Sequence, residues 1–186
     1  MLGLGGLLGA GGWFLARVSS RRRAACQEAA QKLGLQSVGP DTYRGPVRGI
    51  PVELGIGVTV VEGAPLNHLA VVARFITPPE FEFQIAQAGA WPIRHCRLPD
   101  DEAFNRVCEL QSSTPEQLLA LLAFPAVRER VREFIRAGQG CSLVSQHGAV
   151  FKVVSAHVGG SAVVLDAINR AVEVVQALSA PLQQEA

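Results

Sequence analysis

The chain has 186 residues and a mass of 19.8 kDa, which is enough for one domain of ordinary size and too little for two large ones. Hydrophobic residues make up 48% and charged residues 18% of the chain, a composition typical of proteins with a buried core and not of disordered chains. The net charge is +1, so the chain lacks the basic excess of a general nucleic-acid binder. We therefore expect a folded protein whose partners do not include nucleic acid.

The first sixteen residues, MLGLGGLLGAGGWFLA, contain no ionisable side chain. As a helix they would span roughly 24 Å, somewhat less than the roughly 30 Å hydrocarbon core of a bilayer. Their six glycines would destabilise a helix in water, but lipid leaves the backbone no other way to satisfy its hydrogen bonds. We predict that residues 1–20 form a transmembrane anchor, with residues 1–18 in contact with the lipid bilayer. The alternative is a glycine-rich leader of a soluble protein.

Basic residues follow this apolar run instead of preceding it. The first 23 residues contain four arginines and no acidic residue: Arg17, Arg21, Arg22 and Arg23. A secretory signal peptide carries its basic residues first, so this order disfavours cleavage. Because basic residues remain on the cytoplasmic side of a membrane, we predict a single-pass protein whose carboxy-terminal domain is cytoplasmic.

The segment after the arginines has helical spacing. Alanines, Cys26 and Leu33 recur at intervals of three and four, and Gly34 is typical of the residue that follows a helix. We predict that residues 21–40 contain a linker helix, which ends before the break at Gly39 to Asp41.

A period of two replaces the helical period between Tyr43 and Val61, which predicts strands. Prolines 46 and 51 and several glycines in this stretch indicate bends, bulges or an edge position. Residues 68–76 and 80–85 are predicted to form two further strands joined by a Thr-Pro-Pro turn. The apolar residues expected on the inner faces of these strands are Val52, Leu54, Ile56, Val58, Val60, Phe81, Phe83 and Ile85.

Residues 86–103 show no sustained period and are predicted to form a long loop, followed by a short strand over 104–110. Thr114, Pro115 and Glu116 are typical of the start of a helix. The remaining predicted elements are a helix over 116–124, a helix over 126–137, a hairpin over 141–155 that turns near 146–148, and a helix over 159–178.

The order of these elements predicts the fold class. Strands followed by helices, without strict βαβ alternation, indicate an α+β fold with a mainly antiparallel sheet packed against helices. We expect a single α+β domain over residues 41–180, preceded by the amino-terminal membrane helix and followed by a tail of residues 181–186.

The stretch from Pro99 to Leu178 resembles a large uncharacterised family of bacterial membrane-anchored proteins of unknown function. The resembling features are DDEAFNRVCELQSSTPEQLLALLAFPAVRERVREF, which combines an acidic run, a short strand and two helices separated by a proline, and the hairpin that follows it. YRGPVRGIPV, residues 43–52, is similar to the glycine-punctuated strand of that family. The resemblance implies a cytoplasmic domain tethered to a bacterial inner membrane, and it supplies no catalytic residue.

The four cysteines and four histidines do not have the spacing of a metal site or a known nucleophile motif. His95 and Cys96 are the one adjacent pair, but neighbours in sequence rarely have the geometry of a catalytic dyad. We therefore expect no catalytic residue, no metal and no cofactor, and we interpret the cysteines as free thiols in a reducing cytoplasm.

Two charged clusters have structural and functional interpretations. Asp100, Asp101 and Glu102 could approach a hard cation, but they lack the ligand spacing of a calcium loop, so we interpret them as a helix start or solvated charge. Arg128, Arg132 and Arg136 form a stripe that could face anionic lipid. An ordinary solvated helix face is the favoured interpretation, because Glu129 and Glu133 offset the arginines.

The sequence favours a membrane-tethered, non-enzymatic domain that binds the bilayer and an additional partner, such as another membrane protein. Two other classes stay open. The first is a small hydrolase or transferase that uses Cys96 or Cys141 with a histidine brought near by the fold. The second is a module that encloses an apolar ligand between sheet and helices, which would require a dry cavity.

Overall fold

The structure is a computed structural model. It describes residues 20–61, 64–89, 96–136, 141–144, 149–154 and 160–182. A helix of residues 20–33 comes first. The elements that follow are β1 (Gln36–Gly39), β2 (Thr42–Val47), β3 (Ile50–Val61), β4 (Ala64–Arg74), β5 (Phe83–Gln87), α2 (Glu102–Asn105), β6 (Cys108–Ser112), α3 (Pro115–Leu121), α4 (Pro125–Arg136), β7 (Cys141–Val144), β8 (Ala149–Val154) and α5 (Ser161–Leu182).

The strands form one eight-stranded sheet in the order β1-β2-β3-β4-β8-β7-β5-β6. Each neighbouring pair of strands is antiparallel. The β7–β8 hairpin is inserted between β4 and β5, so it joins two sets of strands that are consecutive in sequence. This arrangement confirms the α+β class and the mainly antiparallel sheet.

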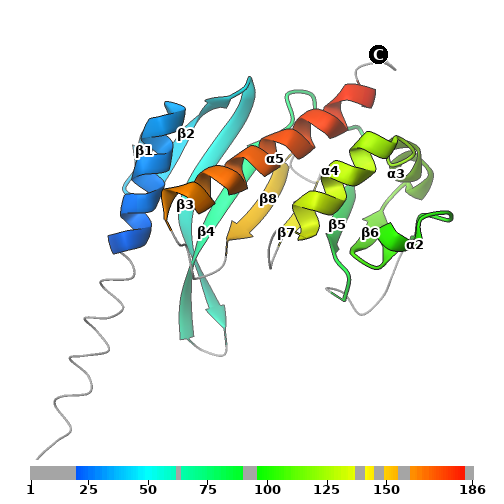
Figure 1. The fold of residues 1–186 in the computed structure, drawn as a ribbon, viewed down its shortest axis with the longest axis horizontal. Helices are drawn as coiled ribbons and strands as arrows, with labels where there is room; N and C mark the ends of the chain where they lie inside the picture. Colours follow the sequence, from blue (N-terminus) through cyan, green and yellow to red (C-terminus); the bar gives the residue numbers. More distant parts are fainter. Residues whose placement is uncertain are drawn as a thin grey trace, which may run out of the picture.

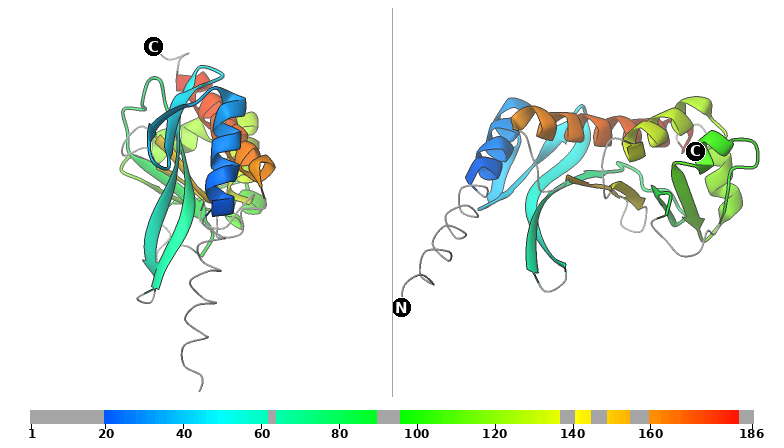
Figure 2. Two further views of the ribbon diagram at one scale, coloured as in Figure 1. Left: turned by 90° about the vertical axis from the view of Figure 1, so that its left-hand side faces the viewer. Right: turned by 60° about the horizontal axis from the view of Figure 1, so that its bottom comes forward.

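The helices form a layer on one face of the sheet (Figures 1 and 2). Helix α5 crosses β3, β4 and β8, and α4 lies beside α5 and packs against β5 and β7. The amphipathic stripe of α5 explains its position, because the residues spaced by three and four along it are fully buried in the core. They are Val164, Ile168, Ala171, Val172, Val175 and Leu178.

The strands present alternate residues to this helical layer. On β3, Val52 and Leu54 are buried in the core, whereas Pro51 is exposed and Glu53 is partly exposed. Val71 and Ala73 of β4 are also buried. The side-chain period of two therefore leaves a second face of β2, β3 and β4 that points away from the helices.

The helix of residues 20–33 ends where the sequence predicted, at Gly34, whose φ of 69° is the left-handed conformation that favours glycine. The prediction of a linker helix over residues 21–40 matches the structure as far as residue 33 and differs from it beyond that point. Ala25, Ala29 and Ala30 belong to the same buried core as the strands, and residues 36–39 form strand β1, which pairs with β2.

The predictions for 68–76, 116–124, 126–137 and 159–178 each match a strand or helix of the structure to within a few residues at their ends. The expected hairpin over 141–155 is present as β7 and β8, and its turn lies outside the described residues.

Two predicted strands differ from the structure. Residues 102–105 form helix α2, so the strand predicted over 104–110 begins only at Cys108. The Asp101 carboxylate accepts a hydrogen bond from the Phe104 amide and starts this helix. The strand predicted over 80–85 is displaced to Phe83–Gln87, which shortens the loop predicted over 86–103.

Within the ranges that the structure describes, no helix is both long enough and apolar enough to cross a bilayer. The anchor predicted for residues 1–20 lies outside the described residues, apart from Ser20.

Candidate functional site

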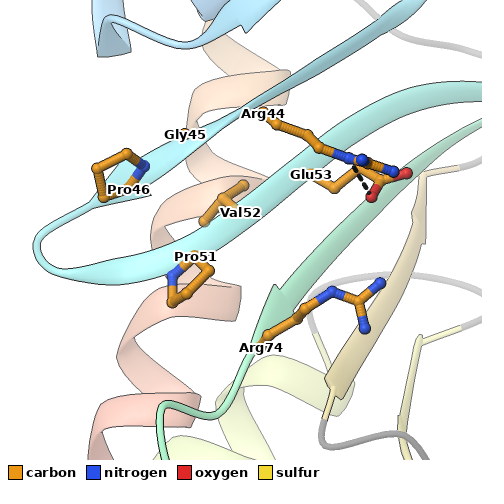
Figure 3. A pocket seen from close by; sticks show the side chains of 7 residues that line it. All are labelled: Arg44, Gly45, Pro46, Pro51, Val52, Glu53 and Arg74. Carbon is orange, nitrogen blue, oxygen red and sulfur yellow. Dashed lines mark hydrogen bonds and ion pairs between the residues drawn. The ribbon is translucent and has the colours of Figure 1, made fainter. Parts of the chain in front are cut away.

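A groove of about 470 Å³ lies on the face of β2, β3 and β4 that points away from the helices (Figure 3). It follows the β2–β3 hairpin and reaches the end of β4. Its lining residues are Arg44, Gly45, Pro46, Pro51, Val52, Glu53 and Arg74.

The register of the β2–β3 hairpin builds the apolar part of the groove. Arg48 and Gly49 have φ values of 51° and 81°, and they join Val47 directly to its partner Ile50. A two-residue turn with both φ values positive matches the twist of an antiparallel hairpin. Pro46 therefore lies directly opposite Pro51, and the two rings form an exposed apolar surface close to the turn.

The next outward pair along the hairpin is charged. Arg44 lies opposite Glu53, and its Nε donates a hydrogen bond to Glu53 Oε2 at 2.8 Å. The two side chains are 59% and 26% exposed, so water screens the pair and its contribution to stability is at most about 1 kcal/mol. The pair can therefore open for a ligand at little cost.

Arg74, the last residue of β4, completes the groove. Its side chain is exposed, and in the described part of the chain it takes part in none of the ion pairs or side-chain hydrogen bonds. Figure 3 shows its guanidinium extending beside the groove, on the β4 side of the two prolines. With Arg44 neutralised by Glu53, the groove has one uncompensated positive charge next to an apolar surface.

The cysteines do not form a nucleophilic site in the described residues. Cys26 and Cys108 are buried, and burial raises the pKa of Cys26 to about 11, with a smaller contribution from the charge of Asp41. Burial likewise raises the pKa of Cys108 to about 12 and raises the pKa of the partly buried Cys96. The thiolate is the nucleophile, and the raised pKa values disfavour the thiolate form of these three cysteines at neutral pH.

The remaining residues of the Cys/His hypothesis lie on different strands or outside the described residues. Cys141 lies at the start of β7 and His68 lies in β4. The other three histidines, His95, His147 and His157, lie outside the described residues. The described ranges also contain no group of three or more His, Cys, Asp or Glu side chains that could hold a metal ion.

The acidic run has a structural role, as its interpretation as a helix start predicted. Asp101 caps α2 and lies 3.8 Å from the Arg128 guanidinium. Arg132 pairs with Glu129 on its own helix. Part of the arginine stripe of α4 is therefore engaged in ion pairs within the protein, and Arg128 and Arg132 are both about a quarter exposed.

Buried side chains from the sheet and from the helices meet in one core. The largest fully buried residues include Leu54, Ile85, Phe134 and Ile168, from both layers. The groove at β2–β4 reaches this core at Val52, and the smaller hollow between α4 and α5 reaches it at Phe134. Charged side chains line both hollows, so neither of the two is the dry cavity that an enclosed apolar ligand would require.

Comparison with known proteins finds a likeness in fold. No family model matches the chain, and no curated protein matches it. Among solved structures, the chain is similar to that of the mycobacterial trehalose monomycolate transport factor A, TtfA. The two chains share 12% sequence identity with a TM-score of 0.54, over 87% of this chain and 94% of the neighbour. At this identity the likeness shows a shared fold.

The sequence analysis did not identify the groove, although it noted both prolines. The signal that could have found it is the spacing in PVRGIP, residues 46–51. Two residues, one of them glycine, between alternating strands are typical of a tight hairpin, which places the flanking prolines opposite each other. The approach of Arg74 depends on the pairing of β3 with β4, which local sequence does not specify.

Proposed function

We propose that this chain is a membrane-tethered, non-enzymatic binding domain and that the groove at β2–β4 is its binding surface. The observation that carries the proposal is the position of this groove on the face of the sheet opposite the helical layer. There an apolar surface, Pro46 and Pro51, lies beside the Arg74 guanidinium, whose charge no described residue compensates.

This arrangement suits binding better than catalysis. A catalytic site needs a nucleophile, acid or base in a defined mutual geometry, and the groove residues are arginines, a paired glutamate, prolines, glycine and valine. The raised pKa values of Cys26, Cys96 and Cys108 argue against the alternative of a cysteine-dependent hydrolase or transferase.

The tether is proposed from the sequence of the amino-terminal segment. An uncharged run of sixteen residues followed by Arg17 and Arg21–Arg23 favours an anchor in a bacterial inner membrane with the folded domain in the cytoplasm. The structural neighbour is described as a transport factor. By fold-level analogy with this factor alone, we propose that this chain serves a transport process by binding a partner, and the proposed anchor would place that process at the membrane.

The test is capture of partners from native membranes with the full chain and two matched charge reversals. Arg74→Glu changes the groove, whereas Arg106→Glu changes an exposed arginine after α2, outside the groove. We expect wild type and Arg106→Glu to retain the same partner and Arg74→Glu to lose it, with all three melting at similar temperatures. Equal retention by Arg74→Glu would show that the groove is not the binding surface.

A further inference from the structure

The loop between β4 and β5 starts at the rim of the groove. Arg74, the last residue of β4, lines the groove (Figure 3), and β5 begins at Phe83. The connecting residues, 75–82, read FITPPEFE, and we call them the β4–β5 loop. Because the loop follows directly on Arg74, groove and loop are neighbouring parts of one surface.

The β4–β5 loop is held in place at both of its ends. Phe75 is buried in the core, and Phe81 packs partly against it, with its ring centroid 5.6 Å from that of Phe83. The Glu82 carbonyl accepts a hydrogen bond from the Ser112 hydroxyl at 2.8 Å. A loop with fixed ends loses less conformational freedom when it binds a partner.

Between these ends the loop exposes an apolar side chain. Ile76 is 63% exposed, which is the highest value for a large hydrophobic residue in the ranges that the structure describes. A single exposed isoleucine is ordinary. Ile76, however, lies two residues beyond Arg74 and is followed by the exposed Pro78, so it extends the apolar surface that Pro46 and Pro51 form in the groove.

The loop also carries negative charge that has no partner in the described part of the chain. Glu80 and Glu82 are both exposed, and neither takes part in an ion pair there. The groove beside the loop carries the uncompensated positive charge of Arg74. One continuous surface thus offers an apolar groove with a cation and an apolar loop with two anions.

We propose that the occupant of the groove is a second copy of this chain, which inserts its β4–β5 loop and receives the loop of the first copy in its own groove. The contacts are Ile76 against the two prolines and Glu80 and Glu82 against Arg74. This inference rests on the binding surface proposed above and names its partner.

The position of the loop beside the groove determines the kind of assembly. A two-fold interface places the same patch of both subunits face to face, so each contact occurs twice. Complementary surfaces on opposite sides of a protein would instead join copies into an open chain. Since each copy presents groove and loop together, the contact closes after two copies and gives a dimer.

The first experiment uses full-length copies with two different tags after Ala186, purified in mild detergent. It measures how much of one copy is captured through the tag of the other. We expect wild type to capture wild type. Arg74→Glu should capture itself several-fold less, and so should the double variant Glu80→Arg with Glu82→Arg, because each sets like charges against each other at both reciprocal contacts.

Mixing the two variants tests the reciprocity of the interface. In a dimer of one Arg74→Glu copy and one copy of the double variant, both contacts again join opposite charges. Capture should therefore return to near the wild-type level. Arg106→Glu, which changes an exposed arginine outside the groove, should behave as wild type does. Absence of self-association in wild type, or a mixture that associates no better than either variant alone, would overturn the proposal.

A second set of variants tests the apolar contact. Ile76→Asp should lower self-capture several-fold and Ile76→Leu should preserve it, because a carboxylate resists transfer from water to the proline surface. Val38→Asp on β1 is the matched control, since Val38 is 52% exposed and belongs to another edge of the sheet. Loss of self-capture in Val38→Asp but not in Ile76→Asp would place the contact at β1 and contradict the proposal. Circular dichroism checks that all variants retain the fold.

Capture from native membranes separates this inference from the proposed function. A foreign protein retained by wild type and by the double variant, but lost by Arg74→Glu, would keep the groove as the binding surface and refute the second copy as its occupant. An Arg74→Glu chain that retains both its self-association and its other partners would refute the groove itself.

Discussion

Asn105 and Leu98 are joined by two hydrogen bonds that close the loop before α2. The Asn105 Nδ2 donates to the Leu98 carbonyl at 2.7 Å, and the Leu98 amide donates to Asn105 Oδ1 at 3.0 Å. Both residues are buried. One carboxamide thus satisfies both backbone groups of Leu98, and it fixes the chain between the Cys96 bridge to β6 and the start of α2.

We predict that Asn105→Ala lowers the free energy of unfolding by about 2 to 6 kcal/mol, because it leaves two buried backbone groups without partners at about 1 to 3 kcal/mol each. Urea denaturation followed by circular dichroism measures this change. Gln111→Ala, which alters an exposed side chain of β6, is the matched control and should change the stability by less than about 0.5 kcal/mol. A loss below 1 kcal/mol for Asn105→Ala, as an approximate threshold, would show that water replaces the carboxamide.

The stripe of α5 gives a second prediction. Ile168 is completely buried in the core, so Ile168→Asp places an unpaired charge there and should cost several kcal/mol, enough to unfold a domain of ordinary stability. Gln176 lies on the exposed side of the same helix, where its amide donates one hydrogen bond to the Arg48 carbonyl at 3.3 Å. Gln176→Asp should therefore lower the melting temperature only slightly. Similar melting curves for the two variants would mean that the register of α5 is wrong.

The buried thiols predict how stability depends on alkaline pH. The pKa of Cys26 is raised from 9.0 to about 11 in the folded protein, and that of Cys108 from 9.0 to about 12. Above pH 9 the unfolded chain therefore releases protons that the folded protein retains, so rising pH favours unfolding. We expect the free energy of unfolding to fall as the pH rises from 9 toward 11.

Chemical denaturation at several pH values measures this fall, and Cys26→Ala is the comparison. The variant should show a smaller decrease over the same range because one of the thiols with a raised pKa is gone. An unchanged slope would assign the alkaline destabilisation to groups other than Cys26.

The proposed tether leads to a fractionation experiment. The full chain should remain in the membrane pellet after alkaline carbonate washing, and deletion of residues 1–20 should release the domain, because the uncharged run precedes Arg21–Arg23. A reporter fused after Ala186 should be active only if it functions in the cytoplasm. Recovery of the intact chain in the soluble fraction would disprove the anchor.

Periodicity identified the longest elements of the fold and missed two of the shortest. The stripe containing Ile168 and Val172 predicted α5 because many residues repeat the same spacing. Helix α2 contains four residues, too few for a period, and depends on the single cap at Asp101. Strand β1 is also four residues long and exists because it pairs with β2. Strand β1 therefore depends on tertiary pairing that local sequence does not encode.

The groove was only partly predictable for the same reason. The opposition of Pro46 and Pro51 follows from a local turn at Arg48 and Gly49, so a reader of the sequence could infer it. Arg74 reaches the groove because β4 pairs with β3 along its whole length, and this register is set by apolar contacts across the sheet.

The docking of the first helix determines how the domain responds to a pull from its amino terminus. The buried face of this helix, Ala25, Cys26, Ala29 and Ala30, packs into the core, and Glu28 accepts hydrogen bonds from Lys32 and from Ser161 of α5, which lower its pKa. Two residues, Gly34 and Leu35, separate the helix from β1. A pulling force applied at Ser20 therefore acts directly on the packing of this helix against the core. In single-molecule extension the helix would have to leave the core and β1 would have to separate from β2 before the remaining strands bear the force.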